Sequence, residues 1–411
     1  MTESRCRTCD APLEHVFADL GTSPLANTYL EQEDLNRPEM FYPLRALVCA
    51  RCFLVQLDEY EPPEKIFSDY AYFSSFSTTW LTHAEDFAAG AIRRFELNQK
   101  SQVIEVASND GYLLQFFSSH DIPVLGVEPA ANVAAVAEAK GVPTCVAFFG
   151  QQLAEDLRSE GLRADLLVGI NVLAHVPDLN DFVAGLARLL APRGTLVLEF
   201  PHLLHLVEEV QFDTIYHEHF SYFSFLSASA ALGRHGLQVF DVEELWTHGG
   251  SLRVFARHGT NHTAGVESSV AVMRQRERDL GYDRLDVYEA FAERVCDEKR
   301  AILSVLIAAK ERGTRVAAYG APAKGNTLLN YCGIRGDFID FTTDLNPRKQ
   351  GRFLPGSHIP IRPPDEIERA RPDLLFILPW NLKDEIIEQM SVIRSWGGKF
   401  LVRTPKLEVV P

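Results

Sequence analysis

The sequence has 411 residues, enough for two or three domains of ordinary size. Hydrophobic residues make up 46% of it and charged residues 23%, which excludes a largely disordered chain. The net charge of −16 argues against non-specific binding to nucleic acid or to anionic membranes. The first residues lack the apolar run of a secretory signal, and no stretch is apolar for long enough to span a bilayer, so we expect a cytoplasmic protein.

Residues 1–66 predict a small metal-binding module. The pairs Cys6-Arg-Thr-Cys9 and Cys49-Ala-Arg-Cys52 can supply four thiolates to one tetrahedral zinc ion. The 39 residues between the pairs must loop out, since a compact zinc ribbon has a shorter gap. Four cysteine ligands leave no open position, so the zinc would be structural. The alternative is a set of reduced thiols in turns.

Residues 67–262 predict a parallel sheet with helices on both faces. Apolar runs such as "SQVIEVAS" (101–108), "PVLGVEP" (123–129) and "PTCVAFF" (143–149) alternate with helical segments. Two further strands, "LQVFDVEELW" and "SLRVFARH", flank a glycine turn at 247–250. We expect these two strands to form an antiparallel addition at the sheet edge.

The turn after the first of these strands is a candidate cofactor site, because ligands of such sheets bind beyond the carboxyl ends of the strands. The strand ends in Glu105, Gly111 opens the next helix, and Ser108 and Asn109 lie between them. Glu128, at the end of the next strand, can accept hydrogen bonds from both hydroxyls of a ribose. A single glycine fits a nucleoside cofactor such as S-adenosylmethionine (SAM) better than a dinucleotide. An ordinary turn without a ligand is the remaining alternative.

Residues 263–411 predict a charged helical connector followed by a second, smaller α/β unit. In "YGAPAKGNTLLN", Gly320 opens a helix after a strand, so backbone amides and Lys324 could meet a pyrophosphate. Asp344 ends the next strand and could bind a ribose. These features also suit a nicotinamide-dependent dehydrogenase or epimerase of nucleotide sugars, although the glycine pattern is incomplete.

The layout as a whole resembles the sugar C-methyltransferases that act on nucleotide-linked 4-keto-deoxysugars in antibiotic biosynthesis. The resemblance covers nearly the full chain in order. It rests on the two cysteine pairs and on "SDYAYFSSFSTTW", "EVASNDGYLL", "GVEPAANV", "NVLAHVPDL", "YHEHFSYFS", "HGGSLR", "YGAPAKGNTLLN" and "LNPRKQGRFLPGSHIPI".

The resemblance implies an α/β protein of three parts. These are a small N-terminal zinc module with four cysteine ligands, a central Rossmann-like SAM methyltransferase sheet, and a C-terminal Rossmann-like α/β domain that helps to bind the nucleotide sugar. The implied cofactors are SAM and a structural zinc ion, and the implied substrate is a dTDP-linked 4-keto-deoxysugar. The cofactor-binding residues are expected to be Glu105, Ser108, Asn109, Gly111, Tyr112, Glu128, Phe148 and Asn171. The substrate-binding residues are expected to be Tyr72, Ser74, His248, Ser251, Arg253, Gly320, Lys324, Asn326, Lys349 and Arg352.

The implied reaction is methylation of the carbon beside the ketone, with C-3 expected, through base-promoted enolate formation and in-line attack on the SAM methyl group. We choose His219 as the base, because an imidazole titrates near neutral pH. His217 is the other candidate in the same motif. The other residues expected in catalysis are Glu218, Tyr216, Tyr70 and His175. We expect a monomer that binds neither nucleic acid nor membranes. A zinc-binding module without catalytic activity is the alternative from outside the enzyme class.

Overall fold

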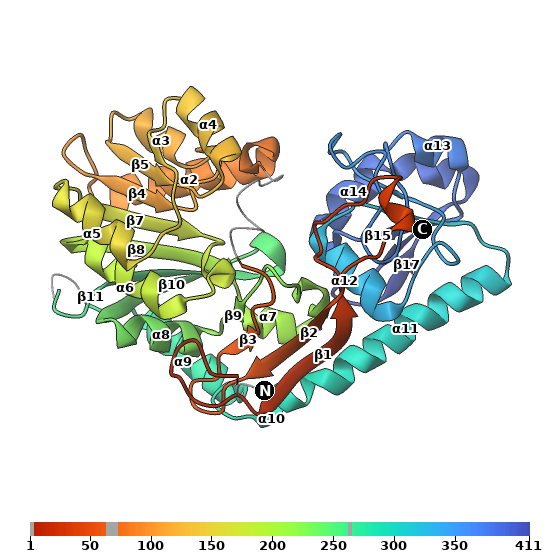
Figure 1. The fold of residues 1–411 in the computed structure, drawn as a ribbon, viewed down its shortest axis with the longest axis horizontal. Coiled ribbons are helices and arrows are strands. Elements are labelled where there is room, and N and C mark those ends of the chain that lie inside the picture. The colour runs from red at the N-terminus through yellow and green to blue at the C-terminus, as the bar shows by residue number, and fades with distance from the viewer. Residues whose placement is uncertain (1–3, 63–72, 262–264) are drawn as a thin grey trace.

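The computed structural model describes residues 4–62, 73–261 and 265–411 (Figure 1). Tyr70 and Tyr72 lie outside these ranges. The described residues form three sheets, of seven, six and four strands. Figure 1 shows the seven-stranded and six-stranded sheets at opposite ends of the molecule, with strands β1 and β2 between them and the long helix α11 below.

The N-terminal part forms the four-stranded sheet, in the order β1-β2-β3-β9. Its strands are β1 (His15–Ser23), β2 (Tyr42–Val48), β3 (Val55–Leu57) and β9 (Ser221–Tyr222). All three pairings are antiparallel. Strand β9 comes from the "YHEHFSYFS" segment, far along the chain from β3, and it pairs through Tyr222 with Val55. The module at the N-terminus is therefore completed by a strand from the middle of the chain.

The central part forms the seven-stranded sheet, in the order β10-β11-β8-β7-β4-β5-β6. The strands from β8 to β6 in this order run parallel, whereas β10 and β11 are antiparallel, which confirms the expected addition at the edge. The strands are β4 (Val103–Val106), β5 (Val124–Val127), β6 (Thr144–Cys145), β7 (Ala164–Ile170), β8 (Leu190–Pro201), β10 (Leu237–Leu245) and β11 (Ser251–His258).

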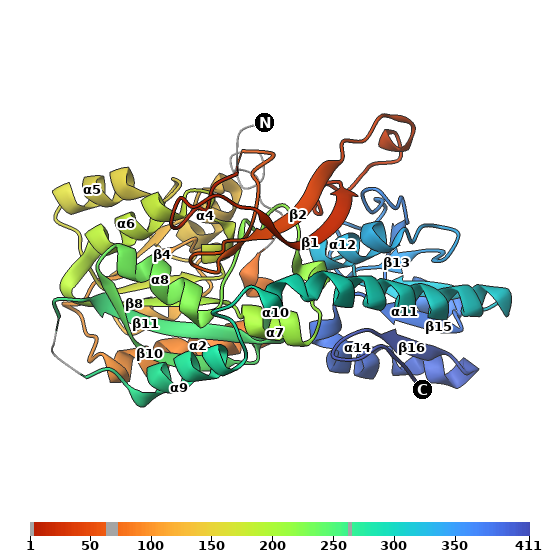
Figure 2. The ribbon, with the colours of Figure 1, turned by 90° about the horizontal axis from the view of Figure 1, so that it is seen from below.

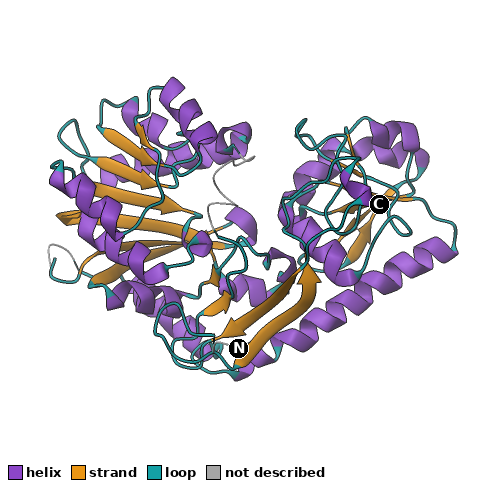
Figure 3. Ribbon diagram, in the orientation of Figure 1, coloured by secondary structure: helices purple, strands orange, loops and turns teal. Residues whose placement is uncertain are grey.

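Helices cover both faces of this sheet (Figure 3), as expected for parallel strands that are buried on both sides. The helices of the central part are α2 (Thr78–Arg94), α3 (Leu114–Ser118), α4 (Ala131–Ala139), α5 (Gln151–Ser159), α6 (Leu179–Leu189), α7 (Leu203–Glu208) and α8 (Phe225–Arg234). Of these, α7 buries its apolar residues in the core shared with the N-terminal module. Short 3-10 turns lie among these elements: η2 (Ser74–Phe76) before α2, η3 (Leu173–His175) between β7 and α6, η4 (Phe212–Thr214) between α7 and β9, and η5 (Thr247–Gly249) between β10 and β11. The run at 143–149 pairs over two residues only, because it lies at the open edge beside β5.

The C-terminal part begins with the connector helices α9 (Ser268–Asp279), α10 (Asp286–Glu289) and α11 (Phe291–Glu311). Phe291 at the start of α11 stacks on Phe17 of β1, with ring centroids 4.4 Å apart. Figure 2 shows α11 extending from there along the six-stranded sheet. Among the described residues, no helix is both long enough and apolar enough to cross a bilayer.

The six-stranded sheet has the order β14-β13-β12-β15-β16-β17 and is parallel except for its last strand. Its strands are β12 (Val316–Tyr319), β13 (Thr342–Thr343), β14 (Ile361–Arg362), β15 (Leu374–Ile377), β16 (Lys399–Val402) and β17 (Glu408–Val410). The helices are α12 (Ala323–Cys332), α13 (Glu366–Ala370) and α14 (Lys383–Gln389), with the 3-10 turns η6 (Trp380–Leu382) and η7 (Ser391–Trp396). This is the second α/β unit that the sequence predicts.

The loop between β1 and β2, residues 24–41, reaches the C-terminal part. It contains the turn η1 (Asp34–Asn36). Leu30 and Phe353 exchange two backbone hydrogen bonds, of 3.0 and 2.9 Å. The Tyr29 hydroxyl donates to the Ala321 carbonyl over 2.7 Å. These contacts fasten the N-terminal module to the six-stranded end of the molecule.

A buried ion pair connects the central and C-terminal parts. Arg403 donates to Asp213 of η4 over 2.7 Å, and both side chains are almost fully buried. The indole of Trp380 donates to the other Asp213 oxygen over 2.8 Å. A buried charge pair of this kind depends on complete hydrogen bonding, because neither ion is hydrated.

Candidate active site

The turn after β4 has the backbone conformation of a ligand-binding loop. Ala107 and Asn109 adopt φ angles of 58° and 49°, a left-handed region that side chains rarely occupy. The Glu128 carboxylate holds this loop by accepting the backbone N–H groups of Asn109 and Ala130, at 3.0 and 2.9 Å. Burial raises the pKa of Glu128. The strained turn is thus braced by the carboxylate that the sequence assigns to a ribose.

Several polar atoms beside this turn are buried and make no hydrogen bond within the described part of the chain. They include the hydroxyl of Ser108 and one carboxylate oxygen of Asp110. Burial raises the pKa of Glu105 well above its ordinary value. Gly126 allows Ser108 to lie there, because a Cβ at position 126 would come within 2.4 Å of the hydroxyl oxygen. Unsatisfied buried polar groups are costly, and the ammonium and hydroxyl groups of SAM are suitable partners for them. These residues therefore fit SAM.

The other residues predicted to bind the cofactor or substrate near this sheet lie at three places. The Tyr112 ring stacks on Trp80 at 6.1 Å, and the backbone N–H of Ser74 donates to Asn109 over 2.8 Å, so both lie at the turn. Asn171 lies at the end of β7, where its amide donates to His248 over 2.9 Å. Phe148 is 41% exposed, in the loop after β6.

The "YHEHFSYFS" segment places two of its polar side chains in direct contact. Nδ1 of His219 lies 3.0 Å from the Thr214 carbonyl, which accepts only, so Nδ1 carries the proton. Nε2 of His219 is then the acceptor for the Tyr216 hydroxyl, at 2.8 Å. His175 donates from Nδ1 to the backbone carbonyl of Glu218 over 2.7 Å, and its ring lies 4.7 Å from that of His219.

Burial controls the protonation of these groups. It lowers the pKa of His219 well below its ordinary value, and the neighbouring His175 adds to this effect. Burial also lowers the pKa of His175 to about 4. At neutral pH both imidazoles are therefore uncharged, and Nε2 of His219 carries a lone pair.

His217 and Glu218 point in different directions from His219. His217 donates from Nε2 to the Pro43 carbonyl over 3.1 Å and lies between the rings of Tyr42 and Tyr60. Glu218 is buried and accepts two hydrogen bonds from Asn27. Burial raises the pKa of Glu218 from 4.5 to about 7, against the opposing effect of Asn27. The motif alone gives no sign of Asn27, which sequence reasoning missed because it lies in a loop far away in the chain.

Lys324 brings a positive charge from the C-terminal part to this cluster. Its ammonium donates to Asn381 over 2.8 Å and lies over the Trp380 ring at 4.4 Å. Burial lowers the pKa of Lys324 to about 8. Burial also lowers the pKa of His248 to about 4, and the Lys324 charge contributes. The same charge is one of those that lower the pKa of His219.

The remaining predicted substrate residues are held by other parts of the fold. Arg253 donates to the buried Glu199 over 3.0 Å, and the Ser251 hydroxyl donates to the Thr247 carbonyl over 2.9 Å. The Asn326 amide donates to the Ala26 carbonyl over 2.5 Å, and Lys349 donates to Ala321 over 3.0 Å. Arg352 pairs with Glu31 at 2.7 Å, and the backbone N–H of Gly320 donates to Thr343 over 2.6 Å. Asn326, Lys349 and Arg352 lie along the junction with the loop at 24–41, and Gly320 precedes the helix that bears Lys324.

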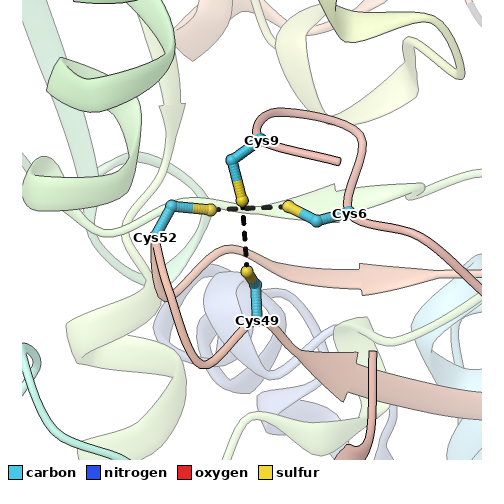
Figure 4. Close-up of side chains that lie close together, drawn as sticks. All are labelled: Cys6, Cys9, Cys49 and Cys52. Carbon is cyan, nitrogen blue, oxygen red and sulfur yellow. Dashed lines mark hydrogen bonds between the residues drawn. The ribbon is translucent and has the colours of Figure 1, made fainter. Parts of the chain in front are cut away.

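The four cysteines of the N-terminal module lie together, and their Sγ atoms are all within 4.8 Å of one another. Figure 4 shows their side chains pointing toward a common centre. The Sγ atoms of Cys6 and Cys52 are 3.4 Å apart, and those of Cys9 and Cys49 are 3.5 Å apart. The Gln56 amide donates to Cys6 over 3.3 Å, as expected beside a thiolate. These residues fit a closed, structural zinc site.

Comparisons with known proteins match all three parts of the chain. A model described as "Putative zinc binding domain" matches residues 6–67, one described as "Methyltransferase domain" matches residues 80–242, and one described as "C-methyltransferase C-terminal domain" matches residues 246–405. C-methyltransferase NovU of Streptomyces niveus is 37% identical over 409 residues, which cover 98% of this chain and 96% of that protein.

Two other similarities cover the central part only. A ubiquinone biosynthesis O-methyltransferase of Rhodopseudomonas palustris (strain TIE-1) is 25% identical over 115 residues, which are 26% of this chain and 46% of that protein. The crystal structure of magnesium protoporphyrin IX methyltransferase from Synechocystis PCC 6803 with bound SAM covers 49% of this chain and 99% of its own, with 14% identity and a TM-score of 0.37.

The seven-stranded sheet, its cofactor turn and the matched domain models together define a SAM-dependent methyltransferase. The match to NovU covers 98% of the chain, and the C-terminal domain model is described as that of C-methyltransferases. The chain therefore belongs to the NovU-like C-methyltransferases, with an N-terminal zinc-binding domain. This assignment replaces both the nicotinamide-dependent enzyme and the non-catalytic zinc module that the sequence left as alternatives.

Proposed function

We propose that this C-methyltransferase acts on a dTDP-linked 4-keto-deoxysugar in antibiotic deoxysugar biosynthesis and methylates C-3, the carbon beside the ketone. The hydrogen bond from Tyr216 to Nε2 of His219 is the observation that supports this most directly. It joins a neutral proton acceptor to a hydroxyl donor, and enolate formation from a ketone needs both groups within reach of neighbouring substrate atoms.

In the proposed reaction, the ketone oxygen of the substrate takes over the hydrogen bond from Tyr216. Nε2 of His219 is then available to accept the proton from the adjacent carbon. His219 suits this role because its lowered pKa keeps the imidazole neutral, with its proton held on Nδ1 by Thr214. His217 also has a lone pair, on Nδ1, but its ring contacts Tyr42 and Tyr60 and its Nε2 donates to Pro43, so it faces the N-terminal module and not Tyr216.

Negative charge then develops on the ketone oxygen, where two groups of the chain can stabilise it. Tyr216 donates its hydroxyl, and Lys324 contributes a buried positive charge from the C-terminal part. SAM supplies the electrophilic methyl group that the nucleophilic carbon attacks. Glu105, Ser108 and Glu128 would hold SAM at the end of the sheet, so that the methyl group faces the substrate carbon.

Lys349, Arg352 and the helix that Gly320 precedes are proposed to receive the nucleotide portion of the substrate. Their support is position: they lie around the same strand ends as Lys324, and the helix α12 begins there. Tyr70 is proposed to act in catalysis, and Tyr72 and Ser74 are proposed to bind the substrate. Of these three, only Ser74 lies within the described residues, next to the cofactor turn.

The experiment incubates the enzyme with SAM and a panel of dTDP-4-keto-deoxysugars, with and without a 3-amino group, and measures the product mass. A gain of one methyl group is expected for at least one sugar, at C-3 by NMR. Without SAM, in heavy water, wild type should exchange the C-3 hydrogen and His219→Ala should not. No mass gain across the panel would refute the substrate class, whereas exchange retained in His219→Ala would remove only the base.

A further inference from the structure

A second cluster of metal-ligating side chains lies outside the four-cysteine site. His202, His205 and Glu244 each offer one ligand atom, and these three atoms lie within 4.8 Å of one another. The histidines are three positions apart at the start of α7, a spacing that places them on the same face of a helix. Glu244 comes from the end of β10, so the cluster joins two separate elements.

The ring of His202 is held by a buried carboxylate. The ring is fully buried, and Nε2 lies 2.7 Å from the buried carboxylate of Glu277. That carboxylate also accepts the backbone N–H groups of Phe225 and Leu226, at 2.6 and 2.8 Å, so it is fixed in place. A carboxylate that holds the outer nitrogen of a histidine and so fixes its tautomer is the usual second partner of a metal-bound imidazole.

The other nitrogen of His202 has no partner. Nδ1 is buried and makes no hydrogen bond within the described part of the chain. Since Nε2–H donates to Glu277, Nδ1 carries the lone pair. A buried acceptor without a donor costs about 1–3 kcal/mol, and a metal ion would remove that cost.

The two remaining ligands are accessible. The side chains of His205 and Glu244 are 24% and 44% exposed, and the closest pair of their atoms is 3.8 Å apart. Arg276 donates to Glu244 over 2.7 Å, and carboxylate ligands are commonly hydrogen-bonded in this way. Metal–ligand bonds of about 2.1 Å place tetrahedral ligands roughly 3.4 Å apart, so the three ligand atoms, now within 4.8 Å of one another, would move closer together on binding.

We propose that His202, His205 and Glu244 form a second metal site, which binds one Zn2+ or a similar divalent transition-metal ion with water at the open position. Two imidazoles and one carboxylate suit zinc, cobalt or nickel, and not magnesium or calcium. The site is independent of the zinc at the four cysteines and of the proposed substrate.

The metal would also act on the turn that bears His248. Gly250 accepts the backbone N–H of His202 over 3.0 Å and lies so close to His205 that an added Cβ would come within 2.4 Å of the ring. A metal that joins α7 to β10 therefore fixes both sides of the turn at 247–250. Occupancy is expected to stabilise the protein against heat.

The test uses the zinc-loaded full-length protein, dialysed against Zn2+ or Co2+ and analysed for metal per chain. Two metal ions per chain are expected for wild type and for the control Glu208→Gln, which removes one negative charge from α7 but no proposed ligand. One equivalent is expected for His205→Ala. Glu244→Gln changes an exposed side chain and should preserve the fold. Loss of a group that only hydrogen-bonds to a metal ligand typically lowers metal affinity by roughly 10–100-fold. Because Glu244 would be a ligand itself, this variant should lower the affinity for the second metal by more than that.

The second Co2+ should give ligand-field absorption without the thiolate charge-transfer bands of the four-cysteine site. Added metal should raise the Tm of wild type and leave that of His205→Ala unchanged. Saturation of wild type at one equivalent would overturn the proposal, and so would a second equivalent bound equally tightly by wild type, His205→Ala and Glu244→Gln.

Discussion

Asn27 donates hydrogen bonds to both carboxylate oxygens of Glu218, over 2.7 and 2.9 Å, although 191 positions separate the two residues in the chain. Asn27 belongs to the loop of the zinc-binding module, and Glu218 lies next to His219 in the proposed active site. The N-terminal module therefore supplies a direct contact to that site as well as a metal centre.

Removal of this contact should change the pH dependence of the enzyme. Burial raises the pKa of Glu218 to about 7 and Asn27 opposes the rise, so Asn27→Ala should move it further upward. If the ionised carboxylate is the active form, the acidic limb of kcat/KM against pH shifts to higher pH. Loss of a hydrogen bond to a charged group, about 1.5–3 kcal/mol, should lower kcat about tenfold or more at pH 7.

Asn36→Ala, the same change at an exposed position of the same loop, is the matched control and should behave as wild type. Equal profiles for Asn27→Ala and Asn36→Ala would show that the contact has no part in turnover.

The zinc site should be required for the same contact. Cys52→Ser removes one of four ligands, so we expect loss of the bound zinc, a lower Tm and loss of methyl transfer, because structural zinc contributes directly to folding. Metal analysis, thermal unfolding and activity measure these three effects. Cys145→Ser, which lies outside the cluster, should keep the zinc at the four cysteines. A zinc-free Cys52→Ser protein with normal turnover would contradict the structural coupling.

The buried pair of Asp213 and Arg403 should be more costly to break than to replace. Asp213→Ala leaves Arg403 buried without its carboxylate partner, and a loss of about 3–5 kcal/mol in the free energy of unfolding is expected. The double variant Asp213→Leu, Arg403→Leu should recover part of this loss, since no lone charge remains. Urea unfolding measures both. This account would be contradicted if the double variant lost more free energy of unfolding than the two single substitutions lose together.

Lys324 should give the enzyme an alkaline limit. Burial lowers the pKa of Lys324 from 10.5 to about 8, so its charge is present below pH 8 and is lost as the pH rises through that value. Above pH 8, wild type should therefore show a higher KM for the dTDP-sugar or a lower kcat. Lys324→Arg should show neither change, because arginine stays charged. Lys324→Met should be impaired at every pH, whereas Lys399→Met on the exposed start of β16 should match wild type. A profile of Lys324→Arg that falls like that of wild type would assign the limit to another group.

Local patterns were sufficient to predict the sheets of the central and C-terminal parts and the cluster of four cysteines. Each depends on residues close in sequence: apolar runs of four to seven residues for the strands, and a tight turn for each cysteine pair. The pairing of β9 with β3 could not be predicted, because the two-residue strand Ser221–Tyr222 has no period of its own and its partner lies far away.

The same limit applies within the proposed active site. The motif gathers His217, Glu218 and His219, but the sequence does not say which way each side chain points. The carbonyls of Pro43 and Thr214 accept a hydrogen bond from His217 and His219, respectively, and Asn27 donates to Glu218. The direction of each side chain is therefore set by residues outside the motif, and backbone carbonyls leave no signature in the sequence.

The loop at 24–41 has a consequence for biosynthesis. Its anchors, Ala321 and Phe353, are synthesised long after the loop itself. Asn27 is therefore held firmly against Glu218 only after most of the chain has been made. A polypeptide released before those anchors could still assemble its cysteine cluster and its seven-stranded sheet. It would lack the anchors that hold Asn27 against Glu218 and also the charge of Lys324, so a prematurely terminated chain is expected to be inactive.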